Sequence, residues 1–288
     1  MKHIQEPART IPIMAETDVL VVGSGPGGLS SAIASAREGI NTILLDRYGC
    51  FGGVLSQVGV EGIAWYRHEQ TLESNGIGNE FEVRAKELGG SSREPQSDSE
   101  ALDAEMFKVV ADKMVLESGV RPLLHAMAVD VIMEDNIIKG VIIESKSGRQ
   151  AILAKRVIDA TGDADIAARA GAPYTKASKE ELMMVTVMFA CRGINRDVFQ
   201  AYVKEELKPS YADWAGESWS QQASDKEKNL FSPYLENPFN RAVKEGLISL
   251  DENISIGGTW STLSPEGDAT QLNMVHMLKQ DCTEVWGL

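Results

Sequence analysis

Residues 18–22 (DVLVV) form a short, nearly all-apolar run, and residues 42–45 (TILL) form another. Runs of this length and character are typical of strands that are buried on both faces of a parallel sheet. Between them, residues 30–38 are rich in alanine and serine and end at Gly39, which is a common helix stop. The order strand, glycine turn, helix and strand within about 30 residues predicts a βαβ unit.

From residue 120 onward, shorter apolar stretches alternate with polar turns such as EDN and KSGR. This pattern predicts a β-meander of three or four strands over about residues 120–157. Farther along, the apolar run 182–190 predicts a central strand, and residues 239–246 predict a short helix. We therefore expect an α/β fold, with a Rossmann-type domain that includes the meander over residues 1–171 and a β-rich substrate domain over residues 172–288.

The turn after the first strand reads GSGPGG, in which Gly23, Gly25 and Gly28 form a GxGxxG motif. The first glycine allows a tight turn, the second lets the backbone approach a pyrophosphate, and the third lets the helix pack on the strand. The helix N-terminus adds free N–H groups and a partial positive charge. Asp46, which ends the second strand, is placed to bind ribose hydroxyls and to repel a 2′-phosphate, although Arg47 weakens that repulsion. The motif predicts a site for NAD or FAD; a glycine turn that serves packing alone is the alternative.

A second glycine turn, ATGD at residues 160–163, follows the last strand of the meander. If that strand joins the same sheet as the first, Thr161 and Gly162 lie beside the first turn, where small residues let the backbone approach a cofactor. FAD is longer than NAD and is usually gripped by an additional segment at its adenosine end, so this turn favours FAD. Asp163 is also placed to cap the helix that follows. A plain strand-to-helix turn with an Asp cap is the alternative.

Residues 5–53, together with the run VIDATGDADIAARAG, resemble the FAD-dependent oxidoreductase family that groups with the glutathione-reductase-type flavoproteins, those with two dinucleotide-binding domains. The resemblance implies that FAD is the cofactor and that its pyrophosphate lies on the first glycine turn. It also implies that the adenosine ribose lies on Asp46, that the backbone of residues 127–129 meets the adenine, and that the second turn closes on the adenosine side. The implied cofactor-binding residues are Gly23, Ser24, Gly25, Pro26, Gly27, Gly28, Asp46, Arg47, Gly52, Gly53, Ala128, Val129, Ala160, Thr161, Gly162 and Asp163.

The candidate catalytic residues lie in the segment 61–78, which follows the Gly52-Gly53 pair. Flavin oxidoreductases transfer a hydride to or from the flavin, and a base usually takes the accompanying proton. Arg67 is suited to bind a carboxylate or to stabilise reduced flavin. His68 titrates near neutral pH and is suited to act as the base. We therefore predict Arg67 and His68 as the catalytic residues; an ordinary solvated loop is the alternative.

Composition excludes several classes of partner. A net charge of −14 over 288 residues argues against nucleic acid and against an anionic membrane surface. No apolar run is long enough to span a bilayer. The three cysteines, Cys50, Cys191 and Cys282, are far apart and show no metal-ligand spacing, which fits a reducing compartment. We expect a cytoplasmic enzyme that binds no metal and acts on a small organic molecule.

Two other functions stay open. One is an NAD-dependent dehydrogenase, which needs only one phosphate-binding turn. The other is a flavoprotein subunit, because nothing after Gly171 matches the Gly-Asp element and closing helix that members of the family carry. Three explanations fit: the sequence is a fragment of a longer protein, another chain completes the site through a homo-oligomer or a complementary subunit, or the protein binds FAD poorly. We favour the first two.

Overall fold

The computed structural model describes residues 2–63, 67–68, 71–72, 75–94, 99–202, 236–256, 262–263, 266–273 and 275–283. The chain forms two compact units, each built from two stretches of sequence. The first unit comprises Met1–Gly53 and Lys108–Tyr174, and the second comprises Val54–Phe107 and Thr175–Leu288. The division at residue 171 into a cofactor domain and a substrate domain stays a prediction.

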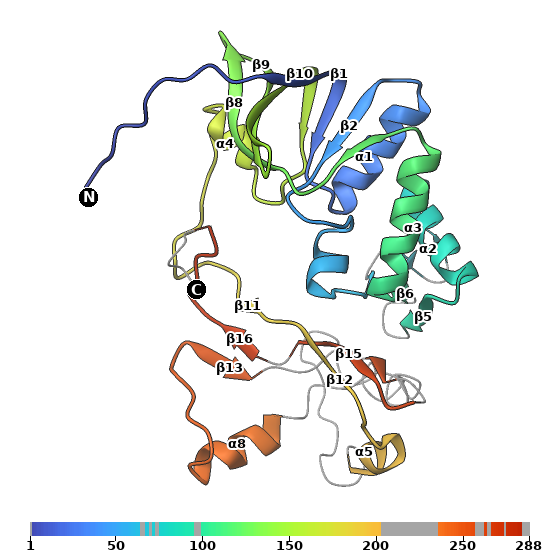
Figure 1. Ribbon diagram of the computed structural model, residues 1–288. Helices are drawn as coiled ribbons and strands as arrows, with labels where there is room; N and C mark the ends of the chain where they lie inside the picture. The colour runs from blue at the N-terminus through green and yellow to red at the C-terminus, as the bar shows by residue number, and fades with distance from the viewer. Residues whose placement is uncertain are drawn as a thin grey trace. The chain divides into compact units, whose positions relative to one another are not determined.

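A six-stranded sheet with the order β7-β2-β1-β10-β9-β8 forms the centre of the first unit (Figure 1). Neighbours among β7, β2, β1 and β10 run parallel, whereas β8, β9 and β10 form an antiparallel meander. The predicted α/β class, with a Rossmann-type sheet and a meander, is confirmed. The strands are β1 (Ile13–Val22), β2 (Thr42–Leu45), β7 (Arg121–Leu123), β8 (Met127–Glu134), β9 (Ile137–Ser145) and β10 (Gly148–Asp159).

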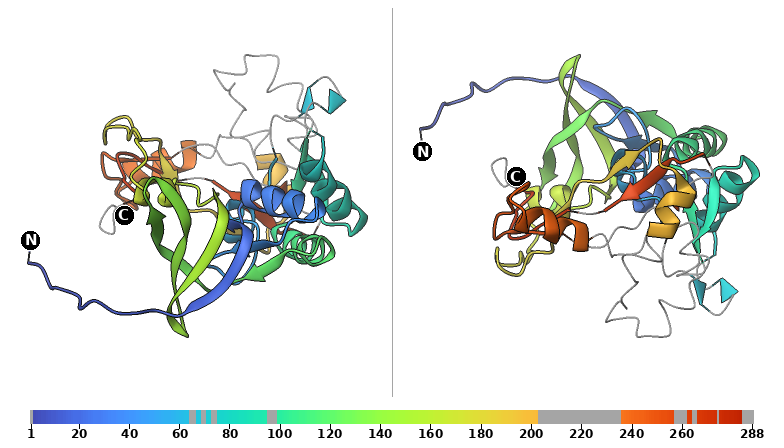
Figure 2. Two further views of the ribbon diagram at one scale, coloured as in Figure 1. Left: turned by 90° about the horizontal axis from the view of Figure 1, so that it is seen from above. Right: turned by 90° about the horizontal axis from the view of Figure 1, so that it is seen from below.

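Helix α1 (Pro26–Arg37) packs against β1, β2 and β10, and Figure 2 shows it beside these strands from above and below. It begins four residues earlier than predicted, because a proline at the first helical position has a suitable φ and needs no N–H partner. Leu29, Ala32 and Ile33 are fully buried on its inner face. The short helix α4 (Asp165–Arg169) packs against β8 and β10.

The two edges of β1 pair with strands from two different parts of the chain, and both strands follow β1 in the sequence. β2 follows α1 and pairs with one edge of β1, while β10, the last strand of the meander, pairs with the other edge. In an open parallel sheet, such a reversal of strand order leaves a crevice at the carboxyl ends of the strands, where ligands bind. The glycine turns of the sequence lie at these ends.

The second unit is built from short elements. Two sheets have three strands each, with the orders β11-β16-β13 and β12-β15-β14, and two hairpins are formed by β3-β4 and β5-β6. Helix α3 begins in this unit and continues in the first. The elements are the π-helix η1 (Val54–Val58), β3 (Arg67–His68), β4 (Thr71–Leu72), α2 (Ile77–Glu87), β5 (Ser91–Glu94), β6 (Ser99–Leu102), α3 (Ala104–Glu117), β11 (Val185–Thr186), β12 (Phe189–Cys191), α5 (Arg196–Tyr202), α8 (Glu236–Lys244), β13 (Ile254–Ile256), β14 (Thr262–Leu263), β15 (Ala269–Leu272) and β16 (Val275–Met277).

The predicted central strand over residues 182–190 is wrong. The run instead forms two short strands, β11 and β12, which belong to two different three-stranded sheets. Met183 is 87% exposed and Phe189 is 43% exposed. An apolar run shows that its side chains prefer burial, but the surrounding elements decide whether partners are there to cover them. The predicted helix over 239–246 is confirmed as α8, which begins three residues earlier.

No helix in the described part of the chain combines the length and apolar character that crossing a membrane requires.

Candidate functional site

The glycine loop, residues 23–28, connects the end of β1 to the start of α1. Gly23 has a φ of +97°, and a Cβ on it would lie 2.2 Å from the carbonyl oxygen of Ala160. A Cβ on Gly28 would lie 1.8 Å from the carbonyl oxygen of Gly23. By contrast, among the described residues no heavy atom beyond the immediate chain neighbours and the turn of the helix itself lies within 4 Å of the Cβ positions of Gly25 and Gly27. Two of the motif glycines thus permit close packing, and the middle one, Gly25, faces open space.

The same loop presents backbone donors. The first intrahelical hydrogen bond runs from the amide of Leu29 to the carbonyl of Gly25, at 2.9 Å. The amides of Gly27 and Gly28 precede it and therefore have no helical carbonyl to bind, and Pro26 has no N–H. These donors, the positive end of the helix dipole and the open space above Gly25 suit a phosphate group. The loop therefore fits the pyrophosphate of a dinucleotide.

Asp46 holds the glycine loop in place. One carboxylate oxygen, Oδ2, accepts hydrogen bonds from the amide of Ser24 at 2.6 Å and from its hydroxyl at 2.5 Å. The other, Oδ1, accepts from the amide of Tyr48 at 2.8 Å. A carboxylate has about four lone-pair positions, so one remains for a ribose hydroxyl. The guanidinium of Arg47 lies over the Tyr48 ring, 4.8 Å from its centre.

The Gly52-Gly53 pair lies against the same loop. The amide of Gly52 donates to the carbonyl of Ser24 at 2.9 Å. A Cβ on Gly53, whose φ is +55°, would lie 2.7 Å from the Cα of Gly25. Only glycine fits this approach without displacing the loop.

The second turn, residues 160–163, lies beside the glycine loop. β10 runs parallel to β1, and the amide of Ala160 donates to the carbonyl of Val22 at 2.8 Å. The Cβ of Ala160 lies 3.1 Å from the Cβ position of Gly28. The two glycine turns, which are about 130 residues apart in sequence, thus meet at the carboxyl ends of neighbouring strands, at the switch point of the sheet.

Asp159, the last residue of β10, organises the second turn. Its carboxylate accepts hydrogen bonds from the amide and hydroxyl of Thr161, at 3.1 and 2.7 Å, and from the amides of Ile166 and Ala167, at 3.0 and 2.9 Å. The hydroxyl of Thr161 also accepts from the first amide of α4 at 3.0 Å. The expectation that Asp163 caps α4 is therefore wrong: Asp163 is exposed, and Asp159 and Thr161 bind the amides.

The predicted adenine contacts, Ala128 and Val129, are half-buried in β8. The strand is tied to the end of β2, because the amide of Ala126 donates to the carbonyl of Asp46 at 3.1 Å. The preceding residue, His125, has a φ of +57° and donates its amide to the carbonyl of Tyr48 at 3.1 Å. The start of β8 therefore lies beside the predicted ribose-binding carboxylate.

The predicted catalytic pair belongs to the second unit. The backbone of Arg67 and His68 forms β3, which pairs antiparallel with β4. Their side chains lie outside what the structure describes, so their assignment as substrate-binding residue and base stays a prediction.

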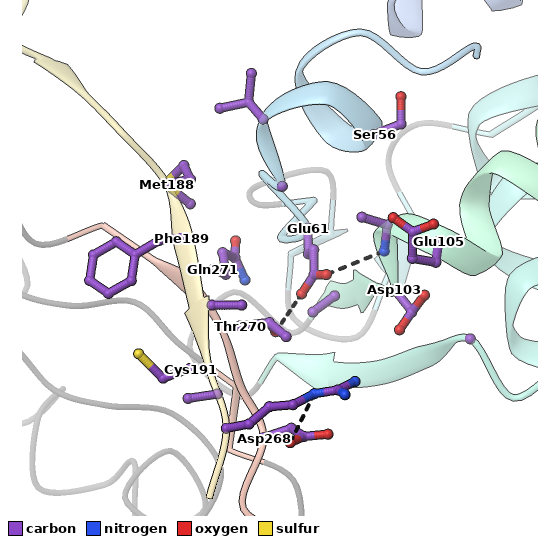
Figure 3. A pocket seen from close by; sticks show the side chains of 18 of the residues that line it. Ser56, Glu61, Asp103, Glu105, Met188, Phe189, Cys191, Asp268, Thr270 and Gln271 are labelled. Carbon is purple, nitrogen blue, oxygen red and sulfur yellow. Dashed lines mark hydrogen bonds and ion pairs between the residues drawn. The ribbon is translucent and has the colours of Figure 1, made fainter. Parts of the chain in front are cut away.

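The second unit contains a cavity of about 680 Å³ near the start of α3 (Figure 3). Glu61 lies in its wall between Thr270 and the first residue of α3. Its carboxylate accepts from the Thr270 hydroxyl at 2.7 Å and from the amide of Ala104 at 3.2 Å. Burial raises the pKa of Glu61 above its ordinary value of 4.5. The cavity thus has a buried, hydrogen-bonded carboxyl group on its wall.

Gln271, also on the wall of this cavity, is buried and has a φ of +59°, which is rare for a residue other than glycine. Its amide oxygen accepts from the amide of Gly62 at 2.8 Å. Its amide nitrogen is buried and has no acceptor among the described residues. Sequence reasoning missed Glu61 and Gln271, because no local motif marks residues that meet across some 200 positions. Asp159 did have a signal: like Asp46, it closes an apolar strand.

All three cysteines are free thiols. Within the ranges that the structure describes, no group of His, Cys, Asp and Glu side chains could hold a metal ion.

Comparison with known proteins identifies relatives. The family described as FAD dependent oxidoreductase matches residues 18–284. A thiamine thiazole synthase of Saccharolobus islandicus (strain L.S.2.15 / Lassen #1) is 32% identical over 165 residues, which is 52% of this chain and 57% of that protein. A thiamine thiazole synthase of Methanococcus vannielii is 31% identical over 160 residues, with the same coverage. The match therefore spans little more than half the length of these curated relatives.

Solved structures with a similar fold include a geranylgeranyl bacteriochlorophyll reductase-like protein from Thermoplasma acidophilum. It is 21% identical with a TM-score of 0.46, covering 58% of this chain and 44% of that one. The THI4 protein of Thermovibrio ammonificans is 20% identical with a TM-score of 0.41, covering 68% of this chain and 74% of that one.

Proposed function

The chain belongs to the FAD-dependent oxidoreductases, an enzyme family whose cofactor is FAD, and we propose that it transfers a hydride between FAD and a small organic substrate. One observation carries the proposal: the glycine loop and the second turn lie side by side at the ends of β1 and β10. In that placement the glycine loop offers hydrogen-bond donors for a diphosphate, and the small residues of the second turn let its backbone come close to the bound cofactor.

Each part of this site has a proposed task. The amides of Gly27 and Gly28, which have no helical carbonyl to bind, and the positive helix end hold the pyrophosphate, and Gly25 leaves the open space that it occupies. The remaining lone pair of Asp46 accepts from a ribose hydroxyl, and its other contacts keep the loop preformed. The second turn, residues 160–163, contacts the adenosine half of FAD. When bound, FAD supplies the hydride acceptor or donor. In this proposal, Arg67 binds the substrate and His68 holds the proton that leaves it.

The finer grouping with glutathione-reductase-type flavoproteins is also a proposal, supported by the resemblance of residues 5–53 and 157–171. The same holds for a partner that completes the site, whether a second copy or another chain. Similarity to the thiamine thiazole synthases covers only 52% of this chain, so we do not extend their substrate to it.

The test uses ADP, which represents the pyrophosphate and adenosine half of FAD. Gly25→Ala places a methyl group in the open space above the loop without a clash and without a forbidden φ, so the variant should fold. Gly78→Ala is the matched control, because its Cβ also meets nothing within 4 Å among the described residues and it lies in α2, which belongs to the second unit, whereas the loop belongs to the first.

We expect the purified chain to bind ADP in calorimetry and to retain flavin, seen as visible absorbance. Gly25→Ala should weaken ADP binding about tenfold or more, which is about 1.4 kcal/mol, while Gly78→Ala leaves it unchanged. A chain that binds no ADP, or one in which both variants bind as the parent does, would contradict the proposal. A colourless chain that binds NADH more tightly than FAD would favour the dehydrogenase alternative.

A further inference from the structure

Two hydrogen bonds join the distant segments that form one wall of the cavity in the second unit. The Thr270 hydroxyl donates to the Glu61 carboxylate at 2.7 Å, and the amide of Gly62 donates to the side-chain oxygen of Gln271 at 2.8 Å. Successive side chains of a regular strand point to opposite faces. Gln271 departs from that geometry with a φ of +59°, and both Thr270 and Gln271 reach the same segment. Glu61 and Gln271 therefore lie near each other on the cavity wall.

The side-chain amide of Gln271 has a donor that is not used. Its oxygen is occupied by the amide of Gly62, whereas its nitrogen has no acceptor among the described residues. Only 8% of the residue is exposed, and Figure 3 shows its side chain directed toward Glu61. Buried polar groups are nearly always hydrogen-bonded, so an exception calls for an explanation. An acceptor atom of a ligand in the cavity would satisfy this donor.

The surroundings of this donor favour a neutral acceptor. Burial raises the pKa of the Glu61 carboxyl, which shows that charge is already disfavoured at this wall. A carboxylate or phosphate oxygen would also be repelled by Glu61 and by Asp103, which lines the same cavity. An ammonium group carries donors only, so it cannot satisfy the amide nitrogen of Gln271. The group that fits is a neutral oxygen, such as that of a carbonyl.

Glu61 offers the complementary group. Its carboxylate accepts from the Thr270 hydroxyl and from the amide of Ala104, which uses two of its roughly four lone-pair positions. A remaining position is suited to accept an N–H of the ligand. These contacts also hold Glu61 in place before a ligand arrives, and groups that are already oriented lose little entropy on binding. A molecule with a carbonyl oxygen next to an N–H would meet both residues at once.

We propose that this cavity binds a small neutral primary amide, whose carbonyl oxygen accepts from Gln271 and whose N–H donates to Glu61. The volume of about 680 Å³ suits such a molecule, because ligand pockets measure about 300–1,000 Å³. Met188 and Ala190, which also line the cavity, provide apolar contacts for the rest of the ligand. Binding of the amide stands on the cavity alone, and a role as the substrate would rest on the proposed function.

Three probes of nearly equal shape test the two hydrogen bonds: butyramide, pentan-2-one and butyrate. The ketone keeps the carbonyl oxygen and lacks the N–H, whereas butyrate replaces the amide with a charged group. Each probe is titrated into the purified full chain in a calorimeter at neutral pH. In parallel, nuclear magnetic resonance of isotopically labelled protein follows the side-chain amide signal of Gln271.

One variant removes the donor. Gln271→Glu keeps the shape of the side chain and an oxygen that can accept from Gly62, but it has no N–H to offer a carbonyl. Gln150→Glu is the matched control, because it makes the same change at a half-buried position of β10, which belongs to the first unit.

We expect butyramide to bind and to shift the side-chain amide signal of Gln271. Pentan-2-one should bind about threefold to tenfold more weakly, because one hydrogen bond is lost, and butyrate about tenfold or more weakly. Gln271→Glu should weaken butyramide binding about tenfold or more, since it leaves the carbonyl without a donor and adds a repelling charge. Gln150→Glu should leave it within about twofold of the parent, the range expected of a change far from the ligand.

Several results would overturn the proposal: no butyramide binding, a ketone or butyrate that binds as tightly as the amide, an unmoved Gln271 signal, or equal effects of the two variants. If Gln271→Glu does not fold, the probe series and the Gln271 signal of the parent decide the question. Flavin retention without amide binding would refute the cavity assignment and leave the oxidoreductase proposal standing, whereas amide binding without flavin would do the reverse.

Discussion

Two neighbouring glycines of α1 should respond in opposite ways to the same substitution. A Cβ on Gly28 would lie 1.8 Å from the carbonyl oxygen of Gly23, 2.9 Å from its carbonyl carbon and 3.1 Å from the Cβ of Ala160. The obstacle is backbone, which cannot rotate aside as a flexible side chain can. Overpacking typically costs about 1–3 kcal/mol, and we expect Gly28→Ala to lie at the upper end. Alanine's helix propensity offsets up to about 1 kcal/mol of this, so the net loss is about 2–3 kcal/mol.

Gly27 is exposed on the same turn, and a Cβ there would meet nothing within 4 Å. Gly27→Ala should therefore gain about 0.5–1 kcal/mol from propensity alone. The free energies of unfolding of the two variants should differ by about 3 kcal/mol, a large part of the 5–15 kcal/mol that is typical of a domain.

Urea unfolding of flavin-free protein, followed by far-UV circular dichroism, measures this difference without the stabilisation that a bound ligand adds. Tight packing of Gly28 on the loop is refuted if the free energy of unfolding of Gly28→Ala lies within about 0.5 kcal/mol of that of the parent, since surface substitutions normally fall in that range. It is also refuted if both variants shift in the same direction by the same amount. Either result would mean that the helix does not pack on the loop as closely as the structure shows.

Three further predictions concern carboxylates and their partners. Asp159→Ala should lower the free energy of unfolding by about 1–2 kcal/mol, because it leaves the amides of the second turn and α4 without an acceptor. Asp163→Ala, which changes an exposed residue, should leave the free energy of unfolding unchanged. Thermal unfolding of the two variants measures the difference. Ser24→Ala removes a buried hydrogen bond to Asp46 and should destabilise the fold by about 1–3 kcal/mol; an unchanged urea midpoint would contradict this. Burial raises the pKa of Glu61 above 4.5, so its folded form binds a proton more tightly than its unfolded form. The stability that this carboxyl contributes is full below pH 4.5 and is lost as the pH rises through the raised pKa. As the pH rises through this range, the urea midpoint of the parent should fall relative to that of Glu61→Gln. A difference between the two midpoints that does not change with pH would argue against a raised pKa of Glu61.

The local pattern of apolar and polar residues was sufficient to predict the first βαβ unit and the meander. The apolar runs at 18–22 and 42–45 form the buried parts of β1 and β2, because strands covered on both faces tolerate few polar side chains. The glycine motif and the acid at Asp46 were also visible, since each serves a backbone or a charge requirement within one unit. The hydrophobic pattern at residues 182–190 wrongly predicted one central strand, because hydrophobicity alone does not show whether another strand lies alongside.

By itself, the sequence determined the Rossmann-type unit, its glycine loop and the family to which the chain belongs. The tertiary structure decided that the turns at residues 23–28 and 160–163 meet, that Asp159 rather than Asp163 caps α4, and that Glu61 meets Thr270 across about 200 residues. The physical reason is the range of the interactions. Strand burial, helix starts and turn conformations depend on neighbours within a few residues, whereas a binding site depends on which distant segments the packed sheet brings together.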